Sequence, residues 1–120
     1  MTAEINPREA VSEVTKVLWR LRGVLLTLLG CFLICAVPMY EGGGAINTVT
    51  RTGSSLGETL YFCAITALTI GYGDVVPTTT LGRIVAVLLG FLGVLITGVV
   101  TASTVYGIQL AAQKAHPPTQ

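Results

Sequence analysis

The chain is short of charged residues. Only 11% of its 120 residues are charged, 52% are hydrophobic, and the formal net charge is +1. A balance so close to neutral gives no reason to expect nucleic acid as a partner. Two long stretches, residues 23–39 and 84–109, carry no charge at all. Uncharged apolar stretches of this length indicate a small integral membrane protein in the lipid bilayer.

Cysteine and histidine are also scarce. The three cysteines, Cys31, Cys35 and Cys63, all lie in apolar segments. Their odd number and their location argue against a disulfide framework. The only histidine is His116, so neither a histidine-containing metal site nor a serine triad can be assembled. We therefore expect that the protein is not an enzyme.

Residues 1–22 predict an amphipathic helix. Asn6 suits the N-cap and Glu9 suits the return half of a capping box. Apolar residues recur at helical spacing from residue 10 to residue 21. The charged residues lie on other sides of this helix: Arg8, Glu9, Glu13, Lys16 and Arg20. We expect either a helix on the cytoplasmic membrane surface, with Trp19 at headgroup level, or a cytoplasmic extension of the first membrane span.

Two membrane spans are expected, an outer helix over residues 23–40 and an inner helix over residues 83–110. As helices, their uncharged stretches would cover roughly 25 and 39 Å, enough to cross the hydrocarbon with flanking residues or with tilt. Four basic residues precede the first span, whereas only Arg51 and Arg83 lie between the spans. The positive-inside rule therefore places the N-terminus, and with two spans also the C-terminus, on the cytoplasmic side of the cell membrane.

The segment between the spans predicts a loop and a short helix. Residues 41–54 are polar and contain three consecutive glycines, so we expect an extracellular turret. Residues 55–68 form a helix in this prediction, because Ser55 and Glu58 have the spacing of a capping box. This helix is too short to cross a membrane. It would stop at mid-depth, with its negative C-terminal end facing a cation.

Residues 69–74 read Thr-Ile-Gly-Tyr-Gly-Asp. Non-helical backbone at membrane depth is tolerated only where protein buries it or where water lines it. Backbone that alternates between left- and right-handed conformations can aim successive carbonyls at one axis, and Gly71 and Gly73 enter the left-handed region without strain. Carbonyl oxygens and the Thr69 hydroxyl could then replace the water around a monovalent cation, provided that several copies surround the axis.

This stretch resembles the selectivity-filter signature of potassium channels, T-V/I-G-Y-G-D. The similarity extends from about Gly23 to about Gln109 and follows the two-transmembrane pore module of prokaryotic-type potassium channels. The resemblance implies an all-α membrane fold with an outer helix, a re-entrant pore helix with its filter, and an inner helix. It also implies a homotetrameric pore. The potassium ions would be bound at Thr69, Ile70, Gly71, Tyr72 and Gly73, with no organic cofactor.

The resemblance also assigns roles around the filter. Tyr61 and Phe62 match the aromatic positions that pack around the filter and brace its width. Asp74 matches the acid behind the filter mouth. Ile65 stands where some members carry a glutamate that pairs with this aspartate, so Asp74 needs an aromatic or backbone donor, for which Tyr61 is a candidate. Thr66 would lie at the pore-helix end that faces the cavity.

The inner helix carries the candidate cavity and gate residues. Gly93 lies at the spacing of the family's gating glycine, twenty residues after Gly73, so it would either permit bending or allow close packing. For Gly90 and Gly98 we expect packing. Thr97, Thr101 and Val105 form a stripe at four-residue spacing that would line a hydrated cavity. Either Val105 or Tyr106 would form the cytoplasmic constriction.

The remaining segments carry little function in this prediction. Thr78, Thr79 and Thr80 follow the filter; we expect them to be solvated, with one of them capping the inner helix. Residues 111–120 would form a cytoplasmic tail that is unstructured from Lys114 onward. The chain contains no voltage-sensing helix, nucleotide-binding segment or calcium-binding loop. Either the pore gates itself or a regulatory domain or subunit lies outside this chain.

The leading functional hypothesis is a potassium-selective channel that conducts passively. A non-selective monovalent cation channel is the first alternative, although the intact Tyr72 disfavours it. A non-conducting membrane scaffold is the second. A scaffold gives no physical reason to keep a complete filter, a capped pore helix and cavity threonines together.

Overall fold

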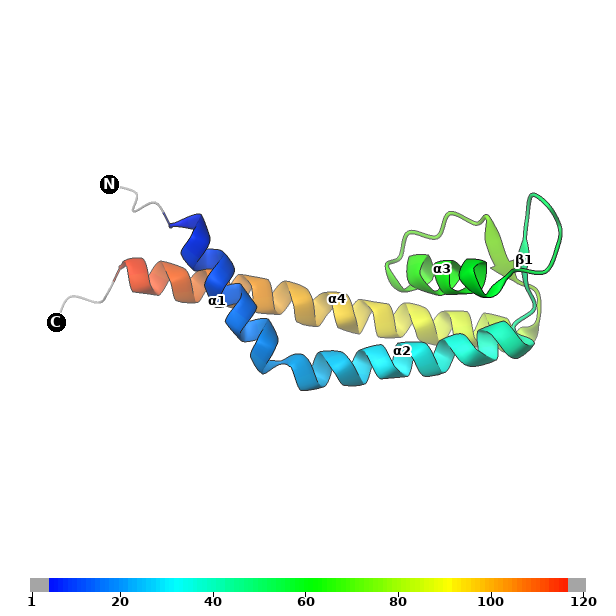
Figure 1. The fold of residues 1–120 in the computed structure, drawn as a ribbon, viewed down its shortest axis with the longest axis horizontal. Helices are drawn as coiled ribbons and strands as arrows, with labels where there is room; N and C mark the ends of the chain where they lie inside the picture. The colour runs from blue at the N-terminus through cyan, green and yellow to red at the C-terminus, as the bar shows by residue number, and fades with distance from the viewer. Residues whose placement is uncertain (1–4, 117–120) are drawn as a thin grey trace. The chain divides into compact units, whose positions relative to one another are not determined.

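The computed structural model describes residues 5–116. The expectations for residues 1–4 and for the tail at 117–120 lie outside the described residues. The described residues form four helices and two short strands, whose course along the chain can be followed in Figure 1. Their order is α1 (Pro7–Arg20), α2 (Arg22–Gly42), β1 (Ala45–Asn47), α3 (Leu56–Ala67), β2 (Val75–Pro77) and α4 (Thr80–Ala115). Two of them, α2 and α4, are long and apolar enough to cross a membrane.

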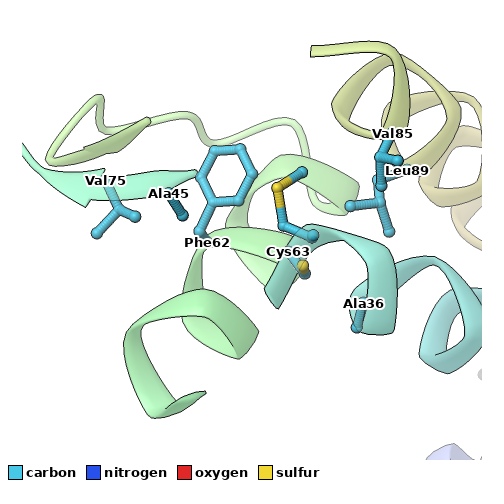
Figure 2. Packing of buried hydrophobic residues seen from close by; sticks show 8 residues of the cluster. Ala36, Ala45, Phe62, Cys63, Val75, Val85 and Leu89 are labelled. Carbon is cyan, nitrogen blue, oxygen red and sulfur yellow. The ribbon is translucent and has the colours of Figure 1, made fainter. Parts of the chain in front are cut away.

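The described chain forms two compact units, one of residues 26–97 and one of residues 5–25 and 98–116. The first unit has a small hydrophobic core to which α2, α3, α4 and both strands contribute. Figure 2 shows Phe62 and Cys63 of α3 within it, together with residues of the strands, α2 and α4. Burial of this apolar surface holds α3 to the two long helices.

The helix α3 begins as the sequence predicts. Ser55 is its N-cap, and its hydroxyl accepts the Glu58 amide N–H at 3.2 Å. A Glu58 carboxylate oxygen accepts the Ser55 amide N–H at 2.8 Å in return. The helix ends at Ala67, one residue before the expected end, and Leu68 caps it.

A short antiparallel pair of strands, not predicted from the sequence, occupies part of the expected turret. Strand β1 pairs with β2, with Ala45 opposite Pro77 and Asn47 opposite Val75. The two strands are three residues each and lie on either side of α3 in the sequence. So short a strand gives no periodic signal, and its pairing depends on contacts distant in sequence. This strand pair fixes the loop before α3 to the segment after the filter sequence.

The helix α4 is longer than the predicted 83–110 at both ends. Its N-cap is Thr79, whose hydroxyl accepts the Gly82 amide N–H at 3.0 Å. The Thr79 hydroxyl also donates to the Gly42 carbonyl at 2.8 Å, and the Thr78 hydroxyl donates to the Gly44 carbonyl at 2.7 Å. As expected, these threonines are exposed and one of them, Thr79, caps the helix, but the hydroxyls of Thr78 and Thr79 also bond to backbone carbonyls. They tie the start of α4 to the end of α2.

The second unit contains α1, the start of α2 and the last part of α4. Asn6 caps α1 as predicted, but its side chain accepts the Arg8 amide N–H rather than that of Glu9, so the expected capping box does not form. Leu21 separates α1 from α2, so α1 is not a continuous extension of the first long helix.

Within this second unit α1 packs against α4. A Cβ atom built on Gly107 would lie 2.7 Å from the Val14 backbone, so only a glycine permits this approach. Glu13, expected among the charged positions away from the apolar side, is 8% exposed. Its carboxylate pairs with Lys114 of α4 at 2.6 Å and with Lys16 at 2.9 Å. The prediction that the chain is unstructured from Lys114 onward is wrong for Lys114 and Ala115, which are helical.

Candidate functional site

The backbone of residues 69–73 alternates in hand. Positive φ values occur at Thr69 (60°), Gly71 (57°) and Gly73 (79°). The two glycines adopt the left-handed conformation that the sequence predicts. Thr69 was not expected there, because a side chain branched at Cβ is strained in this region by roughly 1–2 kcal/mol. The pattern thus extends over three alternate positions, and strain of this kind concentrates at functional sites.

Residues 69–73 are called the alternating ribbon, or simply the ribbon, from here on. The amide groups at its start bond back to α3. The Thr69 amide donates to the Thr66 carbonyl at 3.0 Å, and the amides of Ile70 and Gly71 donate to the Ile65 carbonyl at 2.9 and 3.3 Å. Within residues 5–116, the carbonyl oxygens of residues 69–72 accept no hydrogen bond. The first three amides of the ribbon are therefore bonded to α3, while its carbonyls at residues 69–72 are unbonded within the described residues.

The side chains of the ribbon are open to their surroundings. Tyr72 is 71% exposed and Ile70 is 48% exposed. A hollow beside Thr69 is lined by a strip of α4 that includes Val87 and Phe91. Phe91 is itself 73% exposed. A single chain therefore leaves the carbonyl-bearing segment and the adjoining face of α4 uncovered.

Of the inner-helix glycines, Gly93 takes the packing role that was one of its two predicted alternatives. A Cβ atom at Gly93 would collide with the backbone of Ala67, the last residue of α3. At Gly90 and Gly98, where packing was expected, a Cβ atom would meet nothing within 4 Å, so the packing prediction is wrong within this chain. Gly93 therefore lets α4 approach the last residue of α3, and α4 continues through Gly93 as one helix.

Two aromatic residues and one acid flank the ribbon. Phe62 is buried near Val75, which follows the ribbon (Figure 2). Burial and, after it, the neighbouring Asp74 carboxylate raise the pKa of the Tyr61 phenol, the candidate partner for Asp74. The Oδ1 atom of Asp74 is buried without a hydrogen-bond partner within residues 5–116. A donor from outside the chain would satisfy this atom.

The loop before α3 holds the end of the ribbon at Gly73 and Asp74, a contact that the sequence did not predict. The Thr48 amide donates to the Asp74 carbonyl at 2.8 Å. The Thr48 hydroxyl reaches the same oxygen at 3.0 Å and the Gly73 carbonyl at 3.3 Å. The preceding Asn47 is a typical turn residue, which is the only local signal in the sequence. The contact itself joins residues about 25 positions apart, so spacing could not predict it.

Glu58 connects this loop to α3. Its carboxylate accepts the Ser55 amide and, at 3.0 Å, the side-chain amide of Asn47. The bond from the Ser55 amide and, to a lesser extent, the bond from Asn47 hold the pKa of Glu58 below its ordinary value. Glu58 therefore remains ionised and keeps its acceptor role at neutral pH.

Two of the inner-helix threonines differ from their neighbours. The hydroxyls of Ser103 and Thr104 donate to the carbonyls four residues earlier, at 2.6 and 2.9 Å. Within residues 5–116, no such bond is made by Thr97 or Thr101, both of which are exposed. Free hydroxyls on an apolar helix require a polar neighbour such as water.

The two candidate gate residues lie on different sides of α4. Tyr106 lines a hollow of about 320 Å³ together with Val17, Leu21 and Ser103, so it faces the α1 side within its unit. Val105 is exposed and does not line this hollow.

Comparisons with known proteins bear directly on this arrangement. A family model described as "Ion channel" matches residues 23–107, well over half of the chain. Comparison with solved structures gave no significant match.

Several curated potassium channels are similar to the chain. The intermediate conductance calcium-activated potassium channel protein 4 of Rattus norvegicus is 41% identical over 70 residues, covering 58% of this chain and 16% of that protein. Two pore potassium channel b of Oryza sativa subsp. japonica is 36% identical over 83 residues, covering 67% and 22%. The voltage-gated potassium channel of Aeropyrum pernix is 32% identical over 85 residues, covering 70% and 25%.

The chain spans about a sixth to a quarter of the length of these three relatives. The residues that the family model matches contain nearly all of α2, α3, the alternating ribbon and most of α4. Taken with the two long apolar helices, the family match identifies a membrane protein and not an enzyme. The chain belongs to the ion channel family.

Proposed function

We propose that four copies of this chain form a potassium-selective pore that conducts ions passively down their electrochemical gradient. The observation that supports this most strongly is the ribbon at residues 69–73, where three alternate residues have positive φ and the carbonyls of 69–72 are unbonded within the described chain. One ribbon supplies too few oxygens to replace an ion's hydration shell. A ring of four supplies enough, and Thr69, Ile70, Gly71, Tyr72 and Gly73 then bind the dehydrated ions.

The exposed residues support assembly. Tyr72 and Phe91 leave large apolar surfaces open in the single chain, and further subunits or lipid would cover them. A neighbouring subunit would also be a source for the donor that Asp74 Oδ1 lacks. In this proposal Tyr61, Phe62 and Asp74 support the filter from behind, and Thr66 lies at its inner end.

The inner helix would line the cavity and form the gate. Thr97 and Thr101, whose hydroxyls do not bond their own helix, would face the water of the cavity. We place the cytoplasmic constriction at Val105, because Tyr106 lines the hollow on the α1 side of its unit. The protein would lie in the cell membrane with both termini cytoplasmic.

The test is ion flux through the protein reconstituted in liposomes. We expect potassium to pass much faster than sodium, and barium to block, because it resembles dehydrated potassium in size and carries twice the charge. Equal sodium and potassium flux would instead indicate the non-selective channel. A protein that is monomeric or dimeric in detergent at all concentrations and passes neither ion would indicate the scaffold.

A further inference from the structure

The outer end of the filter ribbon is anchored by one residue of the preceding loop. Thr48 donates its amide N–H to the Asp74 carbonyl at 2.8 Å. Its hydroxyl proton is shared between the Asp74 carbonyl at 3.0 Å and the Gly73 carbonyl at 3.3 Å, with the shorter bond to Asp74. Two consecutive peptide planes at the end of the ribbon are therefore held from outside it.

Thr48 is itself held in place by its neighbour. The Asn47 side-chain oxygen accepts the amides of Val49 and Thr50 at 2.9 and 3.2 Å, which forms the local turn. The Asn47 side-chain nitrogen donates to Glu58 at 3.0 Å. Glu58 belongs to the capping box of α3. A continuous polar chain thus leads from the first turn of α3 to the Gly73 carbonyl.

These polar contacts make α3 a frame for both ends of the ribbon. Its last turn binds the amides of residues 69–71, and its first turn reaches the carbonyls of residues 73 and 74 through Asn47 and Thr48. The Thr48 hydroxyl takes no part in the local turn, because the turn is closed by Asn47. Its only bonds within residues 5–116 go to the end of the ribbon. The hydroxyl therefore serves the filter rather than the loop.

We propose that Thr48 is a positioning residue that sets the orientation of the outermost filter carbonyl, that of Gly73, and thereby contributes to discrimination between potassium and sodium. This inference rests on the proposed function. Selectivity in a carbonyl-lined filter depends on the size of the ring and on the number and field of its oxygens. A Gly73 carbonyl without its partner rotates more freely and adapts to a smaller ion.

The experiment compares potassium and sodium flux in liposomes for the full chain and three variants. Thr48→Val keeps the shape and the amide N–H but removes the hydroxyl, and we expect the potassium-to-sodium flux ratio to fall about two- to tenfold, the factor that one neutral hydrogen bond contributes. Thr48→Ser retains the hydroxyl and should stay close to the wild-type ratio. Thr50→Val is the matched control, because the Thr50 hydroxyl pairs with Thr52 at 2.7 Å and is not bonded to the ribbon.

A further variant, at Asn47, tests the same series of hydrogen bonds one residue before Thr48. Asn47→Asp keeps the acceptor that closes the turn but places a carboxylate against Glu58, so the ratio should fall while Thr48 is intact. If Thr48→Val does not assemble, the ratio in Asn47→Asp decides. If Thr48→Val and Asn47→Asp assemble and keep the wild-type flux ratio, the role of Thr48 is overturned and the proposed function still stands. A wild-type protein that passes sodium as fast as potassium would overturn the proposed function, and this inference with it.

Discussion

Gly73 has a φ of 79°, and a Cβ atom at this position would meet nothing within 4 Å. An alanine there is therefore strained only by its backbone, by roughly 1–2 kcal/mol, and a shift to negative φ would relieve the strain while turning the carbonyl away. We expect Gly73→Ala to abolish potassium flux in liposomes while the protein still assembles. Gly98→Ala is the control, since a methyl group there meets no atom within 4 Å and the residue is helical. Unchanged flux in Gly73→Ala would contradict the carbonyl geometry.

Gly93 presents the opposite case, in which space rather than backbone is limiting. A Cβ atom there collides with the Ala67 backbone, so Gly93→Ala must push α4 away from the end of α3. Overpacking of this kind typically costs about 1–3 kcal/mol. We expect a lower melting temperature in detergent and reduced potassium flux. Gly90→Ala meets no neighbour and replaces a glycine in a helix, so it should melt at or above the wild-type temperature.

At the scale of elements, α1 is joined to α4 by a charged contact that the sequence did not indicate. Glu13 of α1 binds Lys114 of α4 and Lys16 of its own helix. Only the first bond connects the two helices. We therefore expect Lys114→Gln to increase hydrogen exchange and proteolysis in α1, and Lys16→Gln, the matched control on α1 itself, to have a smaller effect. Equal effects would mean that Glu13 does not hold the helices together.

The same contact predicts a dependence on pH. The bond from Lys114, which has the larger effect, and the bond from Lys16 lower the pKa of Glu13 below its ordinary value of 4.5. The pKa of such a carboxyl is lower in the folded than in the unfolded protein. Its contribution to stability is complete when the pH is above the unfolded-state pKa, and it is lost as the pH falls through the folded-state pKa. The α1 contact should thus be intact at neutral pH and should weaken below about pH 4.5, measured by hydrogen exchange. Glu13→Gln should remove this dependence and should be weaker than wild type at neutral pH.

The elements differ in how far the sequence predicts them. The long helices and α3 follow from apolar length and from the Ser55 capping box, which are local properties. The strand pair of β1 and β2, the Thr48 anchor and the Glu13 bridge depend on pairs of residues far apart in the chain, so no local pattern contains them. Glycines marked two of the three left-handed positions, but the third, Thr69, carries a side chain that disfavours that conformation.

At the scale of the whole molecule, the proposed filter links assembly to ion binding. Cations bound in a ring of carbonyls are ligands of the assembled state only, so they stabilise it by mass action. We expect the oligomer in detergent to melt at a higher temperature in potassium chloride than in sodium chloride at the same concentration. Gly73→Ala should reduce this difference. Identical melting in the two salts, with an oligomer of four chains, would count against ion binding in the filter.

The bonds to the ribbon also divide its peptide planes into restrained and unrestrained ones. Each plane contains the carbonyl of one residue and the amide of the next. The planes that contain the amides of Ile70 and Gly71 are fixed to Ile65, and the plane of the Gly73 carbonyl is bonded to Thr48. Within residues 5–116, the two planes on either side of Tyr72 have no hydrogen bond at all. A peptide flip that interrupts conduction would therefore start beside the tyrosine, since rotation there breaks no existing bond within the subunit.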